Sequence, residues 1–177
     1  MKYFLLMVML LLLTACSQNV QKQNEPIIME VSNMKITSPV FENNGDIPSK
    51  YTCDGKDVNP ELVIEDVPEN AKTLALIVDD PDAPAGTWVH WVVWNIPKDI
   101  GKIEEDSVPG IEGMNDFRKN SYGGPCPPSG KHRYYFKLYA LDAMLNLDAS
   151  ATKKDLELAM QGHILAKAEI VGLYSRV

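Results

Sequence analysis

Three acids and a histidine lie close together in the sequence, on either side of a short loop that contains two prolines. Asp79, Asp80 and Asp82 follow an apolar run, and His90 comes eight residues after the last of them. Each proline fixes a backbone angle, so the loop should hold its carboxylates in place. A carboxylate that accepts a hydrogen bond from one imidazole nitrogen leaves the other nitrogen to meet a ligand. The pattern therefore predicts a preorganised polar pocket.

A second unusual loop occurs further along the chain and precedes another of the three histidines. Gly123 and Gly124 allow the backbone to approach a ligand closely, and the prolines after them stiffen the loop. His132 and Tyr134 stand two residues apart, which places them on one face of the strand that follows. His90 alone could be a satisfied core residue, but two histidines at loop–strand junctions favour a shared site.

Strands must position these groups. Residues 74–78 form a short apolar run that ends in turn residues, which predicts a buried strand. Residues 88–96 predict a second strand, and residues 135–141 predict a third. Thr152, with Asp155 in the capping-box position, predicts the start of a helix that ends near residue 160. Strict alternation in the second strand would place Trp88, His90, Val92 and Trp94 on one face, and Val89, Trp91 and Val93 on the other.

The first residues have the anatomy of an export signal, because Lys2 supplies a positive charge and residues 3–13 form an unbroken apolar run. The run is shorter than the roughly 20 residues that span a bilayer as a helix. Its ending, Leu-Thr-Ala-Cys16, resembles the lipobox of bacterial lipoproteins. That resemblance implies a signal peptide over residues 1–15, cleavage after it, and lipidation of Cys16. An ordinary cleaved signal with an incidental cysteine is the alternative.

The remainder divides into a tether and one domain. Residues 16–26 are polar and predict a flexible tether, and residues 27–177 have the length of a single domain of about 150 residues. Lipidated Cys16 would hold this domain at a membrane of the cell envelope. Ser17 after the cysteine is compatible with the periplasmic face of the outer membrane, if the organism has two membranes.

Charge and cysteine content narrow the possible partners. The chain has 24 acids against 17 bases, a net charge of −7. An acidic surface argues against nucleic-acid binding and offers no basic stripe to anionic lipids. After Cys16 only two cysteines are left, Cys53 and Cys126, each in a turn-rich loop. Two spare cysteines in an exported chain predict one disulfide, which would join the two loops.

The motifs resemble those of the phosphatidylethanolamine-binding protein family, in its bacterial branch of Raf-kinase-inhibitor-like proteins. The resemblance is carried by Asp80-Pro-Asp-Ala-Pro84, by the strand around His90, and by Gly124-Pro-Cys-Pro-Pro-Ser-Gly-Lys-His-Arg-Tyr134. Residues 51–55 and 162–172 extend it over nearly all of the domain. It implies a mostly β fold of two antiparallel sheets with a few short peripheral helices. It also implies a small surface cavity that binds anions such as phosphate or phosphorylated headgroups.

The resemblance further implies which residues line or support that cavity, and it implies neither a cofactor nor a metal ion. The cysteine within Gly-Pro-Cys-Pro-Pro departs from the shorter Gly-Pro-Pro of animal relatives, which leaves open the proline that touches the ligand. By motif position the site residues are Asp80, Asp82, Ala83, Pro84, Trp88, His90, Gly124, Pro125, His132 and Tyr134.

An anion that binds beside aspartates is repelled by their negative charge unless protonated groups offset that charge. Carboxylates close to imidazoles favour the imidazolium form, so both histidines are expected to donate to phosphate oxygens. The Tyr134 hydroxyl and the loop N–H groups would add further donors, and an ammonium group of a headgroup could meet an aspartate.

Three classes of function fit these residues. A noncatalytic binding module for a small anion or phospholipid headgroup is favoured, because no serine or cysteine nucleophile stands with a base in a recognisable arrangement. A protein-interaction role, such as inhibition of a kinase or protease, is known among the relatives, but the sequence identifies no protein partner. A metal-dependent hydrolase is less favoured, because the spacing of the aspartates and histidines matches no metal-binding motif.

Overall fold

The computed structural model describes residues 33–176. The predicted signal peptide, Cys16 and the predicted tether lie outside the described residues. Between residues 33 and 176, no helix is both long and apolar enough to cross a membrane.

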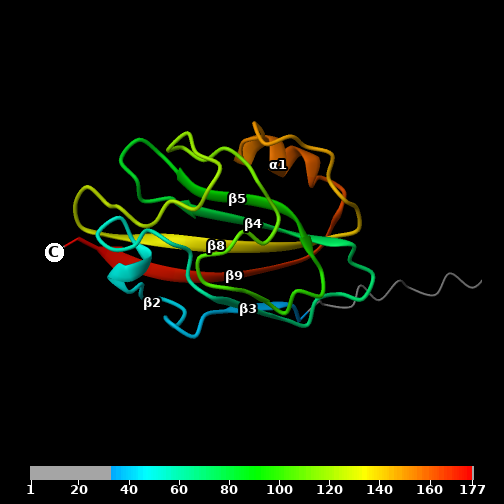
Figure 1. Cartoon of the computed structure of the whole chain (residues 1–177), viewed down its shortest axis with the longest axis horizontal. Coiled ribbons are helices and arrows are strands. Elements are labelled where there is room, and N and C mark those ends of the chain that lie inside the picture. Colours follow the sequence, from blue (N-terminus) through cyan, green and yellow to red (C-terminus); the bar gives the residue numbers. More distant parts are fainter. Residues whose placement is uncertain (1–32, 177) are drawn as a thin grey trace, which may run out of the picture. The chain divides into compact units, whose positions relative to one another are not determined.

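Most of the regular structure is β, as the family resemblance implied (Figure 1). One short 3-10 helix, η1 (Ser49–Tyr51), and one α-helix, α1 (Lys153–Ala159), accompany the strands in the described range. The strands are β1 (Lys35–Thr37), β2 (Gly45–Asp46), β3 (Leu62–Glu65), β4 (Thr73–Asp80), β5 (Trp88–Pro97), β6 (Lys102–Ile103), β7 (Ile111–Glu112), β8 (Lys131–Leu141) and β9 (Ile164–Ser175).

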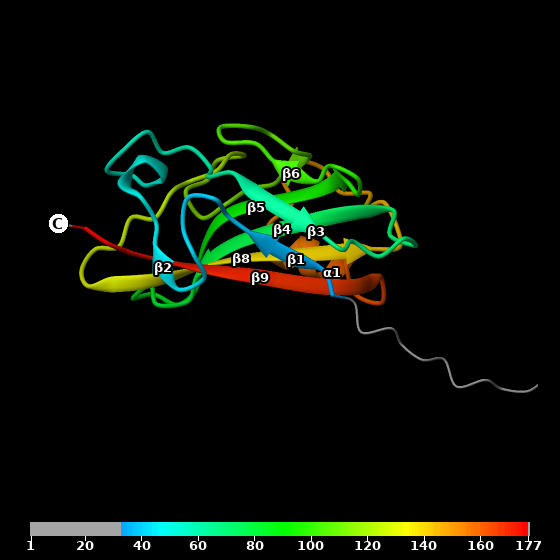
Figure 2. The ribbon, with the colours of Figure 1, turned by 90° about the horizontal axis from the view of Figure 1, so that it is seen from below.

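These strands form two sheets. The larger has the order β2-β9-β8-β4-β5-β7, and the smaller has the order β1-β3-β6. Pairing is antiparallel throughout both sheets except between β2 and β9. Figure 2 shows the smaller sheet lying across one face of the larger sheet, and Figure 1 shows α1 on the opposite face.

Apolar residues fill the space on both faces of the larger sheet. The main core lies between the two sheets, where Leu62 and Ile103 of the smaller sheet meet Leu76 and Phe136 of the larger. A second cluster packs Leu156 of α1 against the other face. Every residue of β4 is buried, because this strand lies between neighbours and is covered on both faces. Its apolar run follows from that position.

The capping box predicted for the helix is present. The backbone N–H of Thr152 donates to the Asp155 carboxylate at 2.9 Å, at the start of α1. Leu156 is the buried residue of this short helix. Because a seven-residue helix is marginal alone, packing against the sheet is what stabilises it.

The strict alternation predicted for β5 is wrong. Val78 pairs with Trp91 and Asp79 pairs with Val89, so His90 is an extra residue, a β-bulge on β5. Beyond the bulge the faces are exchanged. Trp88 and His90 share a face, as expected, but Trp91 and Val93 lie on that same inter-sheet side, whereas Val89, Val92 and Trp94 pack towards α1.

Three strand ends meet at one end of the larger sheet. Asp80 at the end of β4 pairs with Trp88 at the start of β5, and Asp79 pairs with Tyr135 near the start of β8. The two loops that the sequence singled out, before β5 and before β8, therefore converge there, on the same side of Figure 1 as the labelled C-terminus.

Candidate ligand-binding site

A cavity of about 300 Å³ opens at this end of the larger sheet. Its residues come from the end of β4 and the loop after it, from the start of β5, and from two parts of the connection between β7 and β8. The sequence-predicted residues that line it are Asp80, Ala83, Pro84, Trp88 and His90, and the others are Ala85, Phe117, Cys126 and Pro128.

Asp80 is the buried acid of the cavity and has two partners in the protein. One carboxylate oxygen lies 2.7 Å from His132 Nδ1, and the other accepts a hydrogen bond from the backbone N–H of Asp82 at 2.8 Å. Only 3% of Asp80 and 7% of His132 is exposed. Because a carboxylate can only accept, Nδ1 is the nitrogen of His132 that carries the proton. His132 thus fixes the orientation of the Asp80 carboxylate, and it does so without lining the cavity.

His90 is oriented by a backbone carbonyl rather than by an aspartate. Its Nδ1 lies 2.7 Å from the carbonyl oxygen of Gly123, which can only accept, so Nδ1 carries a proton and Nε2 is left for a ligand. Burial lowers the pKa of His90, and the neighbouring Gly123 carbonyl and Asp80 charge oppose this only in part. Burial thus favours the neutral ring of His90, whereas the sequence predicted the imidazolium, because no carboxylate is hydrogen-bonded to this buried ring.

Tyr134 completes the polar end of the site. Its ring meets the His90 ring edge to face, with centroids 5.2 Å apart. The residue is fully buried, and its hydroxyl makes no hydrogen bond of standard geometry within the described part of the chain, although the Asp80 carboxylate and the Cys126 backbone lie near it. Burial raises the pKa of Tyr134, and the nearby charge of Asp80 raises it further. The hydroxyl is thus a neutral donor close to the Asp80 carboxylate.

Five of the predicted site residues do not line the cavity: His132 and Tyr134, which pack against residues that do, and Asp82, Gly124 and Pro125. Asp82 forms a two-pronged ion pair with Arg133, at 2.9 and 2.6 Å, and this guanidinium lowers the pKa of Asp82 to about 2. Gly124 and Pro125 pack on the loop that follows η1. A Cβ on Gly124 would lie 2.5 Å from the carbonyl oxygen of Tyr51, which explains the glycine by close packing.

The loop N–H groups expected to face an anion are also engaged within the protein. Gly123 donates to the carbonyl of His90 at 3.1 Å, and Gly124 donates to the carboxylate of Asp57 at 2.6 Å. Both bonds fix the shape of the loop before β8. The prediction that these two groups bind the ligand is therefore corrected.

A disulfide joins Cys53 to Cys126, as the cysteine count predicted, with Cα atoms 5.4 Å apart. The backbone N–H of Cys53 also donates to the carbonyl of Pro125 at 3.1 Å. Since Cys126 lines the cavity, the bridge ties one of its walls to the loop after η1.

Four lining residues were missed by sequence reasoning, and Phe117 is the aromatic one among Ala85, Phe117, Cys126 and Pro128. It is the single aromatic residue between positions 98 and 121, a segment otherwise rich in polar residues and glycine. That isolation was the available signal, but nothing in the spacing placed the segment beside β5. Among residues 33–176, no group of three or more His, Cys, Asp or Glu side chains is arranged to hold a metal ion.

Comparison with known proteins places this geometry in a family. The sequence pattern of the phosphatidylethanolamine-binding proteins matches residues 37–175. A UPF0098 protein of Methanothermobacter thermautotrophicus is 49% identical over 151 residues, which cover 81% of this chain and 99% of that protein. A UPF0098 protein of Aquifex aeolicus is 51% identical over 152 residues, which cover 81% of this chain and 89% of that protein.

Two crystal structures share the fold. A phosphatidylethanolamine-binding protein homologue from Chlamydia trachomatis superposes with a TM-score of 0.80 at 41% identity, covering 82% of this chain and 99% of the homologue. YbcL of E. coli, described as a member of the mammalian family, gives a TM-score of 0.76 at 30% identity, covering 81% of this chain and 99% of YbcL. The chain therefore belongs to the phosphatidylethanolamine-binding protein family.

Proposed function

We propose that this protein is a noncatalytic binding protein whose cavity holds a small phosphorylated ligand, either free phosphate or a phospholipid headgroup. The observation that carries the proposal is that Asp80 and His90 line one preformed cavity, with Tyr134 packed against the ring of His90 behind that lining. The hydroxyl of Tyr134 makes no hydrogen bond of standard geometry among the described residues, and a buried polar group of this kind normally has one. A bound phosphate oxygen would supply the missing acceptor.

The charges of the site are compatible with such a ligand. The negative charge of the Asp80 carboxylate is offset by hydrogen bonds from His132 and from the backbone N–H of Asp82. These bonds reduce the electrostatic repulsion between Asp80 and a bound anion. Neutral His90 offers Nε2 as an acceptor, which suits the P–OH group of a singly ionised phosphate.

The test is an NMR titration of the imidazole signals with inorganic phosphate and with phosphoethanolamine. Saturable shifts at His90 and His132, and no shift at His163, are the expected result. Tyr134→Phe removes only the hydroxyl and should weaken phosphate binding about tenfold, the value of one hydrogen bond to a charged partner. Tyr135→Phe is the matched control, because that hydroxyl accepts a hydrogen bond from the exposed Arg133 side chain at 3.3 Å. Absence of saturable binding by either ligand contradicts the proposal.

We also propose that Cys16 carries lipid and anchors the protein to a membrane of the cell envelope. The support is the lipobox-like ending of the apolar run at residues 13–16. Mass spectrometry of the mature amino terminus should find Cys16 as the first residue with its acyl groups. Cys16→Ser should release the protein from the membrane fraction, and retention of that variant contradicts the anchor.

A further inference from the structure

Phe117 and Trp88 form an apolar wall beside the polar end of the cavity. Their rings meet edge to face at 5.4 Å, and Phe117 also meets the ring of His90 at 5.3 Å. Both aromatic side chains are 36% exposed, so their free surfaces are available to a ligand. Ala85 and Pro128 continue the wall. Polar and apolar surfaces therefore adjoin within one cavity.

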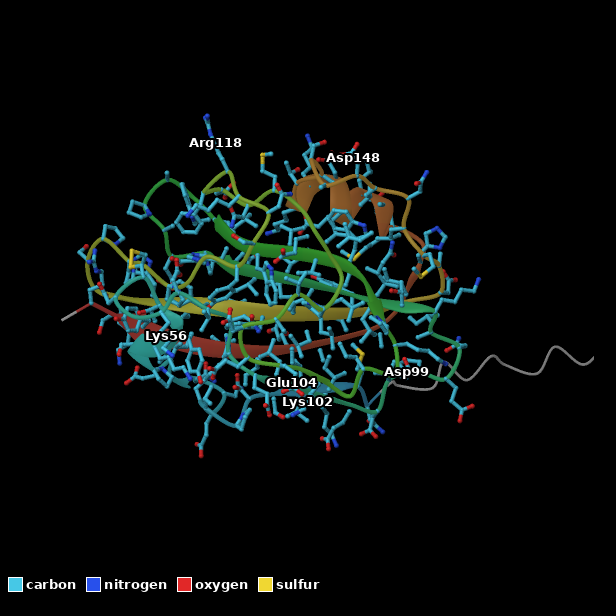
Figure 3. The ribbon with its side chains drawn as sticks, in the orientation of Figure 1. Lys56, Asp99, Lys102, Glu104, Arg118 and Asp148 are labelled. Carbon is cyan, nitrogen blue, oxygen red and sulfur yellow. A yellow bond between two sulfur atoms is a disulfide. The ribbon has the colours of Figure 1, made fainter. Side chains whose placement is uncertain are left out.

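The segment that carries Phe117 is fastened to β5 on both sides of the His90 bulge. The side chain of Asn115 donates to the carbonyl of His90 at 3.1 Å, and the Asp116 carboxylate accepts from the N–H of Val89 at 2.7 Å. Arg118 next in the chain has positive φ and points away from the ribbon in Figure 3. The turn thus sends its charged residue to solvent and sets the aromatic ring against the cavity.

Gly123 links the aromatic wall to the polar end. A Cβ at this position would lie 2.7 Å from the Phe117 ring, so only glycine leaves room for that ring. The carbonyl of the same residue orients His90. One position therefore sets both the apolar surface and the hydrogen-bonding direction of the imidazole.

The size of the cavity exceeds the needs of phosphate alone. A volume of about 300 Å³ is at the lower end for organic ligands, whereas a water molecule occupies about 30 Å³ in the liquid. A five-atom oxyanion at Asp80 and His90 would leave most of the space beside Phe117 and Trp88. Burial of apolar surface is the favourable way to fill it.

Resting on the proposed function, we propose that Phe117 and Trp88 form a subsite for an apolar group attached directly to the phosphate. Phe117 is then a specificity-determining residue, and it acts on the apolar part of the ligand only.

The test is calorimetric titration at pH 6 with methyl, butyl and hexyl phosphate. Affinity should rise about two- to fourfold for each methylene added. Phe117→Ser should remove at least half of that gain, whereas Phe117→Leu should keep it. Methyl phosphate should bind all variants within about twofold, which shows that the polar end is intact. Val108→Ser, an exposed apolar residue of the same segment outside this cavity, is the matched control.

The outcomes separate the two proposals. If neither inorganic nor methyl phosphate binds, the proposed function fails and the subsite fails with it. If methyl phosphate binds but hexyl phosphate binds no better, or if Phe117→Ser leaves the gain unchanged, the subsite alone is overturned.

Discussion

The carboxylate of Asp80 and the Nδ1 atom of His132 are 2.7 Å apart, although 52 residues separate them in the chain. The contact joins the end of β4 to the start of β8, at the sheet end where the cavity opens. Both side chains are buried, so neither has water as an easy substitute for the other. The pair is therefore a structural support and part of the candidate site at once.

Asp80→Asn should lower both stability and ligand affinity. The amide keeps the shape of the side chain but replaces a charged acceptor of His132 by a weaker one, at a cost of about 1–3 kcal/mol in the free energy of unfolding. Urea denaturation measures this cost. Asp82→Asn is the control, because its partly exposed ion pair with Arg133 should contribute less than about 1 kcal/mol. Equal losses in the two variants would contradict the role given to Asp80.

Removing the disulfide should destabilise the protein and disturb the cavity. The bridge joins two cysteines whose sequence separation is 73 residues. Such a cross-link stabilises a domain by about 2–4 kcal/mol. The double variant Cys53→Ser, Cys126→Ser should show that loss in urea denaturation. Wild-type protein in excess dithiol is the matched control and should behave like the variant. Undiminished phosphate affinity in the variant would mean that the bridge does not hold the cavity wall.

Protonation of His90 should oppose folding. Burial lowers the pKa of His90 below its ordinary value of 6.5, so the unfolded chain binds this proton more readily than the folded one. The stabilisation is fully present above pH 6.5 and is lost as the pH falls through the lowered folded pKa. The slope for one group cannot exceed about 1.4 kcal/mol per pH unit. Unfolding free energies of wild type and His90→Gln should diverge in this window, with the wild type losing more towards low pH.

Asp79 should be important for stability but not for ligand binding. It is fully buried on the face of the sheet towards α1, where it pairs with Lys137 at 2.7 Å and Lys153 at 2.5 Å. Asp79→Ala leaves two half-buried amines without their acid and should cost about 3 kcal/mol. Lys153→Met keeps the pair with Lys137 and should cost less. Urea denaturation measures both, and a phosphate affinity that changes in Asp79→Ala would contradict the separation of the two faces.

The sequence predicted the regular parts of the fold because each had a local signal. The apolar run of β4, the alternation at the start of β8 and the capping box at Thr152 depend on residues close in the chain. The disulfide followed from counting, since two cysteines allow one pairing. Five of the predicted site residues line the cavity because their motifs lie at strand ends that pairing brings together.

The other features of the candidate site depend on contacts between residues that are far apart in the chain, and no local sequence pattern indicates these contacts. Asp82 has the same residue type as Asp80, and its pairing with Arg133 is set by the register between β4 and β8. Phe117 reaches the cavity because Asn115 fastens its segment to β5. The protonation of His90 depends on burial beneath groups from three loops, which changes the expected donor into an acceptor.

The extra residue in β5 turns the imidazole of His90 to the cavity side of the sheet. A deletion of one residue before Trp91 would remove the irregularity between Val78 and Asp79, while the second register shift, between Leu74 and Leu76, would remain. The position before Trp91 would then face the helix side of the sheet. More regular pairing of these two strands would therefore cost the candidate site one of its polar groups.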